Sequence, residues 1–228
     1  LNPEAKVGMF SYSWFSGVPD SIKKLPSNVY LSLCYQTEAH YDPEREKATN
    51  ERILGLGKLG ARIVGREYWG THHTLDLPVL NSRKIAENLK LLHSVNAAGI
   101  YGETGNSFAA RASDLYILAK MAWDPTLDRE ALLQDFCDKG FGVASKTMLQ
   151  YFNFIEDRVA TIKSAVAGRE PSEIEQHYSN GYAARHVEYL EIFTPAFLKE
   201  GKALLQLAKK QAQSQEQKDR GEFIFYGH

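Results

Sequence analysis

The sequence predicts an α/β fold in which parallel strands alternate with helices and a wholly helical region follows. Short apolar runs that end in polar or aromatic residues alternate with segments whose apolar residues recur every three or four positions. No hairpin turn separates the runs, and strands joined through helices return to the same edge of the sheet and run parallel. After Gly105 the apolar period is helical almost throughout. We therefore divide the chain into residues 1–105 and residues 106–228.

The first region contains four expected strands, at residues 6–14, 28–35, 61–69 and 98–103. The helices expected between them cover residues 21–25, 45–59 and 82–96. The second region is expected to form helices at residues 110–123, 129–139, 145–167 and 195–212, and the polar residues 204–220 a solvated helix face with a turn. Four consecutive strand–helix units form either half of a (β/α)8 barrel or a small open parallel sheet, and periodicity alone does not choose between them.

Composition and motif spacing argue against nucleic acid, membrane, metal and cofactor. With 27 basic and 28 acidic residues the formal net charge is −1, so no excess of positive charge attracts a phosphate backbone. The longest apolar runs are far shorter than the roughly 20 residues needed to cross a bilayer. Cys34 and Cys137 are expected to be buried small apolar residues. Gly55, Gly57 and Gly60 have the spacing of a dinucleotide-binding loop, but they lie at the end of an expected helix and before a strand.

Candidate binding residues gather at the ends of the expected strands. In a parallel barrel these ends and the loops after them carry the site. Sugar rings stack their apolar faces on indole and phenol rings, and their hydroxyls bind polar side chains at the rim. His72 and His73 lack a third ligand at metal spacing, so we expect them to contact substrate or solvent. The full set of residues that fit a sugar subsite is Tyr12, Trp14, Tyr35, Tyr68, Trp69, His72 and His73.

Two carboxylates, Glu67 and Glu103, end adjacent expected strands and are the candidate catalytic residues. Hydrolysis of a glycosidic bond needs one acid for the leaving oxygen and one carboxylate that activates water or attacks directly. Neighbouring strands lie about 5 Å apart, so both carboxyl groups could face one water. A glutamate just beyond a strand also serves as a helix-cap partner or a solvated loop residue. Strand parity adds a difficulty, because Glu67 pointing into a barrel would turn Arg66 toward the helices.

Two strings carry a resemblance to a known family: GIYGETG at residues 99–105 and DLYILAKMAWDPTLDREALLQDFCDKGFG at residues 114–142. They resemble the segment that joins the catalytic barrel to the helical C-terminal region in glycoside-hydrolase-like proteins of the α-glucuronidase and α-N-acetylglucosaminidase type. The likeness is to an uncharacterised bacterial branch related to those enzymes. It implies the C-terminal half of a (β/α)8 barrel, with the first four strands on a missing N-terminal half of the same protein.

The same resemblance implies a function. It suggests cleavage of a polysaccharide that contains uronic acid or N-acetylhexosamine, without a cofactor, in a secreted or periplasmic protein. In α-glucuronidases two carboxylates flank the attacking water, and Glu67 and Glu103 are the matching positions, although Asp is expected at the first. The general acid would lie outside this chain. Two other functions stay open: a carbohydrate-binding relative that has lost activity, and an unrelated parallel α/β enzyme.

Overall fold

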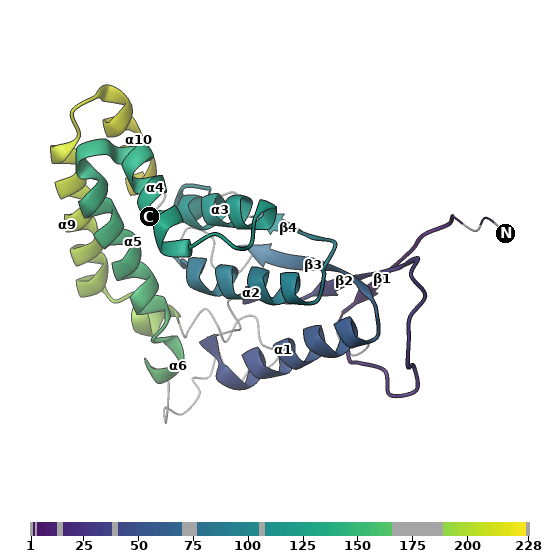
Figure 1. Ribbon diagram of the computed structural model, residues 1–228. Helices are drawn as coiled ribbons and strands as arrows, with labels where there is room; N and C mark the ends of the chain where they lie inside the picture. Colours follow the sequence, from purple (N-terminus) through teal and green to yellow (C-terminus); the bar gives the residue numbers. More distant parts are fainter. Residues whose placement is uncertain are drawn as a thin grey trace.

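The computed structural model describes residues 2, 4–12, 16–37, 41–69, 77–104, 108–165 and 189–226. Within these residues, one sheet of four parallel strands is accompanied by helices (Figure 1). The strands pair in chain order, and each pair is parallel. The predicted α/β class is therefore confirmed, and consecutive parallel strands are the arrangement found in half of a (β/α)8 barrel. The strands are β1 (Val7–Ser11), β2 (Val29–Cys34), β3 (Arg62–Trp69) and β4 (Gly99–Thr104).

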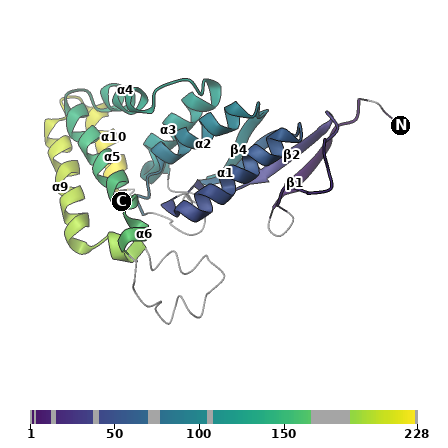
Figure 2. The same cartoon turned by 60° about the horizontal axis from the view of Figure 1, so that its bottom comes forward.

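Helices cover one face of this sheet. Helix α1 (Pro43–Lys58) and helix α2 (Ser82–Ser94) pack on β2 and β3, and α3 (Phe108–Trp123) packs beside α2 and against β4. Figure 2 shows α1, α2 and α3 next to one another along the strands. The strands and helices bury a shared apolar cluster that includes Leu31, Leu33, Ile53, Leu56, Ile63 and Leu92. Alternate strand residues therefore point toward helices, and the residues between them point to the other face.

The local sequence determines where α1 begins and ends. The Asp42 carboxylate accepts hydrogen bonds from the backbone N–H groups of Glu44 and Arg45, at 3.1 and 3.3 Å, and Pro43 occupies the first helical position. The chain leaves the helix through Gly60, whose φ of +75° favours glycine. The glycine triplet of the sequence thus lies at the C-terminal end of a helix, as predicted, and does not form a phosphate-binding turn.

The other face of the sheet, which we call the open face, is not covered by any described helix. Its exposed rings include Phe10, which is 58% exposed, and Tyr101, which is 45% exposed. Side chains from non-adjacent strands meet over it: the hydroxyls of Ser32 on β2 and Tyr101 on β4 share a hydrogen bond of 2.5 Å. By strand alternation and register, the open face carries Gly8, Phe10, Tyr30, Ser32, Cys34, Arg62, Val64, Arg66, Tyr68, Tyr101 and Glu103.

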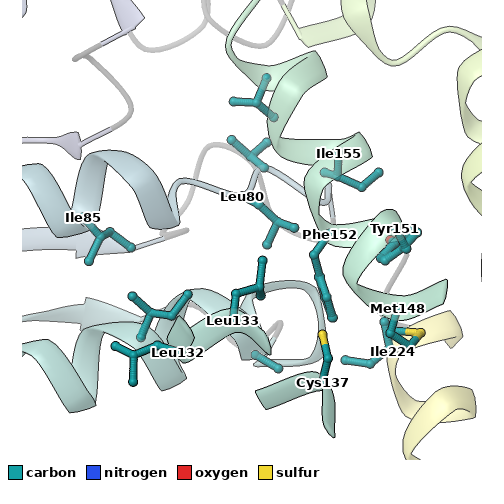
Figure 3. Close-up of a cluster of buried hydrophobic side chains, with 14 of the residues drawn as sticks. Leu80, Ile85, Leu132, Leu133, Cys137, Met148, Tyr151, Phe152, Ile155 and Ile224 are labelled. Atoms are coloured by element: carbon teal, nitrogen blue, oxygen red, sulfur yellow. The ribbon is translucent and has the colours of Figure 1, made fainter. Parts of the chain in front are cut away.

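The rest of the described chain is helical. Its helices are α4 (Arg129–Phe141), α5 (Ser145–Val159), α6 (Ile162–Ala165), α9 (Pro195–Gln211) and α10 (Gln215–Tyr226), with a 3-10 turn at Gly142–Ala144. They bury a second core that includes Leu80, just before α2, and Ile85 of α2, and Figure 3 shows these side chains with Cys137, Phe152 and Ile224. Both cysteines are free and buried, as predicted. None of the helices in the described ranges is long and apolar enough to span a bilayer.

Two predicted helices need correction. The helix expected at residues 21–25 is absent, and this stretch forms turns and bends instead, because five residues are too few to offset the cost of helix nucleation. The helix expected at residues 145–167 ends at Val159, and α6 begins at Ile162. At the break, the Thr161 hydroxyl donates to the carbonyl of Arg158 at 2.7 Å, a local bond that competes with helix continuation. Residues 166 and 167 lie outside the described ranges.

The sheet region and the helical region are joined by buried polar contacts at the N-terminus of α2. This helix has no side-chain cap of its own, and Glu156 of α5 accepts from the Ser82 hydroxyl at 2.9 Å and the Arg83 N–H at 2.7 Å. Arg129 of α4 pairs with the same carboxylate, which is 1% exposed. Asp114 of α3 accepts from the Asn81 N–H at 2.8 Å. The two regions therefore satisfy each other's buried polar groups.

Candidate functional site

The candidate site is centred on Glu103 near the C-terminal end of β4. The register places Tyr101 beside Arg66 and Glu103 beside Tyr68, all on the open face. One carboxylate oxygen of Glu103, Oε1, accepts from the Nη2 of Arg66. The Glu103 side chain is 43% exposed and that of Arg66 is 20% exposed. One oxygen of the Glu103 carboxylate is therefore bound to a cation, while the side chain remains accessible to solvent. A group that contacts a substrate must be accessible in this way.

Arg66 is surrounded by aromatic rings. Its guanidinium carbon lies 4.7 Å from the ring centre of Tyr68 and 5.9 Å from those of Phe10 and Tyr101. Cations at these distances are attracted to the face of an aromatic ring. Burial alone would lower the pKa of Arg66, but its hydrogen bond to Cys34 and its contacts with Tyr68 and Glu103 outweigh burial and raise that pKa. The guanidinium is a permanent positive charge at this site.

Tyr68 supplies a neutral hydroxyl next to this charge. Burial and the nearby Cys34 raise the pKa of the Tyr68 phenol to about 12, although Arg66 opposes the rise. The hydroxyl accepts a hydrogen bond from Arg66 Nη1. Tyr12, which is 44% exposed, lies close enough to influence the charge state of Tyr68. Tyr68, one of the predicted binding residues, therefore lies on the open face beside Glu103, and Tyr12, another of them, is exposed and near enough to act on the pKa of Tyr68.

The structure does not bring Glu67 to this site, and the predicted pairing of Glu67 with Glu103 is wrong. Glu67 is 0% exposed. Its carboxylate accepts hydrogen bonds from the backbone N–H and the hydroxyl of Thr37, and from the N–H of Tyr68 at 2.9 Å. The Thr37 hydroxyl in turn accepts from the amide of Asn88 in α2, at 3.0 Å. Glu67 therefore fastens the segment after β2 to the helix layer and has no access to a substrate.

Strand alternation explains this separation. Glu67 shares the parity of Ile63 and Gly65, which pack against the helices, whereas Glu103 shares the parity of Tyr101. The register pairs Glu67 with Gly102, so the two glutamates are offset by one residue and point to opposite faces. The difficulty foreseen for Arg66 disappears in this arrangement, because Arg66 lies on the open face and Glu103 is its partner.

Tyr35 and Trp69, both predicted to bind sugar, also face the helices. Tyr35 is 6% exposed and belongs to the core under β2, where burial, and then the Glu67 charge, raise the pKa of its phenol well above its usual value. Trp69 lies over Gly102, where an added Cβ would come within 2.5 Å of the indole ring. These two predictions are corrected for the same reason as Glu67: one position along a strand changes the face.

Three other predicted binding residues, Trp14, His72 and His73, lie outside the described residues. Among the residues that are described, no group of three or more His, Cys, Asp or Glu side chains could hold a metal ion. The central residue that sequence reasoning missed is Arg66. The available signal was the alternation of β2, where Leu31 and Leu33 mark the helix side, since parallel pairing transfers that parity to β3.

The profile of the family described as a domain of unknown function, DUF4838, matches residues 1–153. The chain belongs to the DUF4838 family. No curated protein and no solved structure matches the chain significantly. The DUF4838 match spans the sheet, α1 to α4 and part of α5, so the Arg66–Glu103 pair lies inside the DUF4838 domain.

Proposed function

We propose that this DUF4838 domain contributes the carbohydrate-binding face of a glycoside hydrolase and that Glu103 is its catalytic carboxylate. The observation that carries the proposal is the position of Glu103: near the C-terminal end of a parallel strand, partly exposed, paired with Arg66 and flanked by phenol rings. Parallel α/β enzymes place their reactive groups at this end of the strands. Aromatic faces beside a carboxylate are what a sugar ring and an anomeric carbon require.

Glu103 would act as the group that activates water or attacks the anomeric carbon. Hydrolysis also requires an acid that protonates the leaving oxygen. The four described strands contain two carboxylates, and Glu67 is buried on the other face. The proposal therefore places the general acid outside the described strands, on a part of the barrel that is not among these 228 residues. The resemblance of residues 99–105 and 114–142 to α-glucuronidases and α-N-acetylglucosaminidases supports a substrate with uronic acid or N-acetylhexosamine.

A second candidate function is carbohydrate binding without cleavage. The observation that favours it is the loss of Glu67 from the site, which leaves Glu103 as the one carboxylate that the described strands present on the open face. The same rings and the same Arg66–Glu103 pair would then serve recognition alone. The two functions differ in turnover and agree in binding.

The test uses the full-length protein and a panel of aryl glycosides and oligosaccharides of uronic acids and N-acetylhexosamines. Glu103→Gln should lower turnover by about 100-fold or more, because the amide is nearly isosteric but cannot act as base or nucleophile. The matched control is Glu51→Gln, whose side chain is 67% exposed on α1 and which should leave turnover unchanged. The isolated 228-residue chain should bind the same sugars in a calorimetric titration without cleaving them.

Each result has a clear meaning. Turnover that Glu103→Gln preserves would show that Glu103 is structural. Binding of sugars by the full-length protein without turnover of any of them would favour the binding function. Absence of both binding and turnover would reject the carbohydrate proposal altogether.

A further inference from the structure

We propose that Arg66 is the positioning residue of Glu103: it holds one carboxylate oxygen so that the other points to the substrate. This inference rests on the proposed function. The described residues provide a donor for Glu103 Oε1, which is Arg66 Nη2, and none for Oε2. A carboxylate that acts as base or nucleophile needs a free lone pair in a fixed direction. The asymmetry of its two oxygens supplies that geometry.

The guanidinium itself is fixed by groups from three strands. Nη1 donates to the Tyr68 hydroxyl on β3, Nη2 donates to Glu103 on β4, and the strand register places Cys34 of β2 directly beside Arg66. A guanidinium is planar and its donors have fixed directions, so several contacts determine its orientation. The side chain of Arg66 therefore cannot change its contact with Glu103 without losing its other partners.

The fourth strand, β1, contributes an aromatic ring to the surroundings of Arg66. Phe10 of β1 and Tyr101 of β4 lie at the same distance from the guanidinium carbon, 5.9 Å, and Tyr68 lies closer, at 4.7 Å. Arg66 thus sits where side chains of all four strands meet. It is 20% exposed, and Glu103 is about twice as exposed, at 43%. A substrate approaching the open face reaches the carboxylate more readily than the cation that orients it.

Arg62 provides a matched control on the same face of the same strand. Its Nη1 donates to the Tyr30 hydroxyl at 2.8 Å, and its guanidinium carbon lies 5.4 Å from the Tyr30 ring centre. The arrangement resembles the arginine–tyrosine contact of Arg66 and Tyr68 and lies four residues earlier on β3, although Tyr30 belongs to the neighbouring strand β2. No carboxylate belongs to it among the described contacts. Replacement of Arg62 removes a similar side chain while leaving Glu103 and its partner intact.

The experiment compares Arg66→Ala with Arg62→Ala in the full-length protein. Arg66→Ala should lower kcat by about 100-fold, the effect of misplacing a catalytic group by about 1 Å, and should leave KM within about threefold. Added guanidinium ion should restore part of kcat in Arg66→Ala and none in Glu103→Gln. Arg66→Lys keeps the charge but loses the planar fork, and should retain about a tenth of the activity. Arg62→Ala should resemble the unaltered protein.

A second measurement does not depend on activity. Side-chain order parameters from NMR relaxation should fall for Glu103 in Arg66→Ala and stay unchanged in Arg62→Ala. The inference is overturned if the order of Glu103 is the same in both variants, or if Arg66→Ala keeps kcat within about threefold of the unaltered protein. An unaltered protein that cleaves no sugar rejects the proposed function, and the order parameters still decide whether Arg66 positions Glu103.

Discussion

The two faces of the four-stranded sheet differ in the use they make of the same kinds of residue. On the helix-covered face, Glu67 is fully buried and its carboxylate binds Thr37 and the Tyr68 N–H. On the open face, Glu103 binds Arg66 and remains 43% exposed. Both are glutamates near the C-terminal ends of neighbouring strands. Residue type and strand position therefore do not decide whether such a carboxylate is buried in structural contacts or accessible to solvent, because the face of the strand decides it.

The largest expected difference between the two faces is the loss of unfolding free energy when each glutamate is replaced by alanine. Glu67→Ala leaves buried N–H groups of Thr37 and Tyr68 without their acceptor, and should lower the free energy of unfolding by about 4 kcal/mol. Glu103→Ala removes a partly exposed carboxylate and should cost less than about 1 kcal/mol. Urea unfolding of both variants measures the difference. Equal losses would mean that the two faces are equivalent in energy and that the distinction drawn between them is wrong.

A second prediction concerns the carboxylate of Asp114 in α3, which is buried and accepts a hydrogen bond from the Asn81 N–H just before α2. Burial raises the pKa of Asp114 to about 7, although the nearby Arg111 opposes the rise. In the unfolded chain the group ionises near pH 4. As pH rises from about 4 to about 7, the unfolded state therefore releases this proton while the folded state keeps it, and stability falls.

This fall should amount to roughly 2–3 kcal/mol between about pH 5 and pH 7, and it should level off above pH 7. Asp114→Asn keeps the shape and removes the titration, so its unfolding free energy should depend less on pH across that range. Denaturant unfolding at several pH values gives both curves. Parallel curves for the variant and the unaltered chain would show that Asp114 titrates normally in the folded state.

The smallest of the three effects compares two glycines on opposite faces. A Cβ at Gly102 would lie 2.3 Å from the backbone oxygen of Glu67 and 2.5 Å from the Trp69 ring, so Gly102→Ala should cost about 2 kcal/mol or more. A Cβ at Gly8, on the open face, would meet no atom within 4 Å, and Gly8→Ala should be neutral or stabilise slightly. Melting temperatures of the two variants test the contrast. A cost at Gly8 as large as that at Gly102 would indicate that the open face is packed against something.

The sequence by itself determined the local features of this protein. Apolar periods located the four strands and the main helices, since burial of one side of each element imposes those periods. Asp128 directly precedes an expected helix and is a residue type that favours helix N-caps, and its carboxylate accepts from the Ala131 N–H at 2.8 Å. The burial of Cys34 and Cys137 also followed from residue type. These features depend on neighbours within one or two helical turns, which a sequence displays directly.

Only the tertiary structure decided which carboxylate reaches the open face. Side chains alternate along a strand with a period of two, and β3 carries apolar residues of both parities at Ile63 and Val64. Its own apolar pattern therefore does not determine the face of Glu67. The partner of Glu103 is Arg66, 37 residues away, and the partner of Glu67 is Thr37, 30 residues away. Such pairs form through strand register and helix packing. Register is a property of the assembled sheet, and no single strand specifies it.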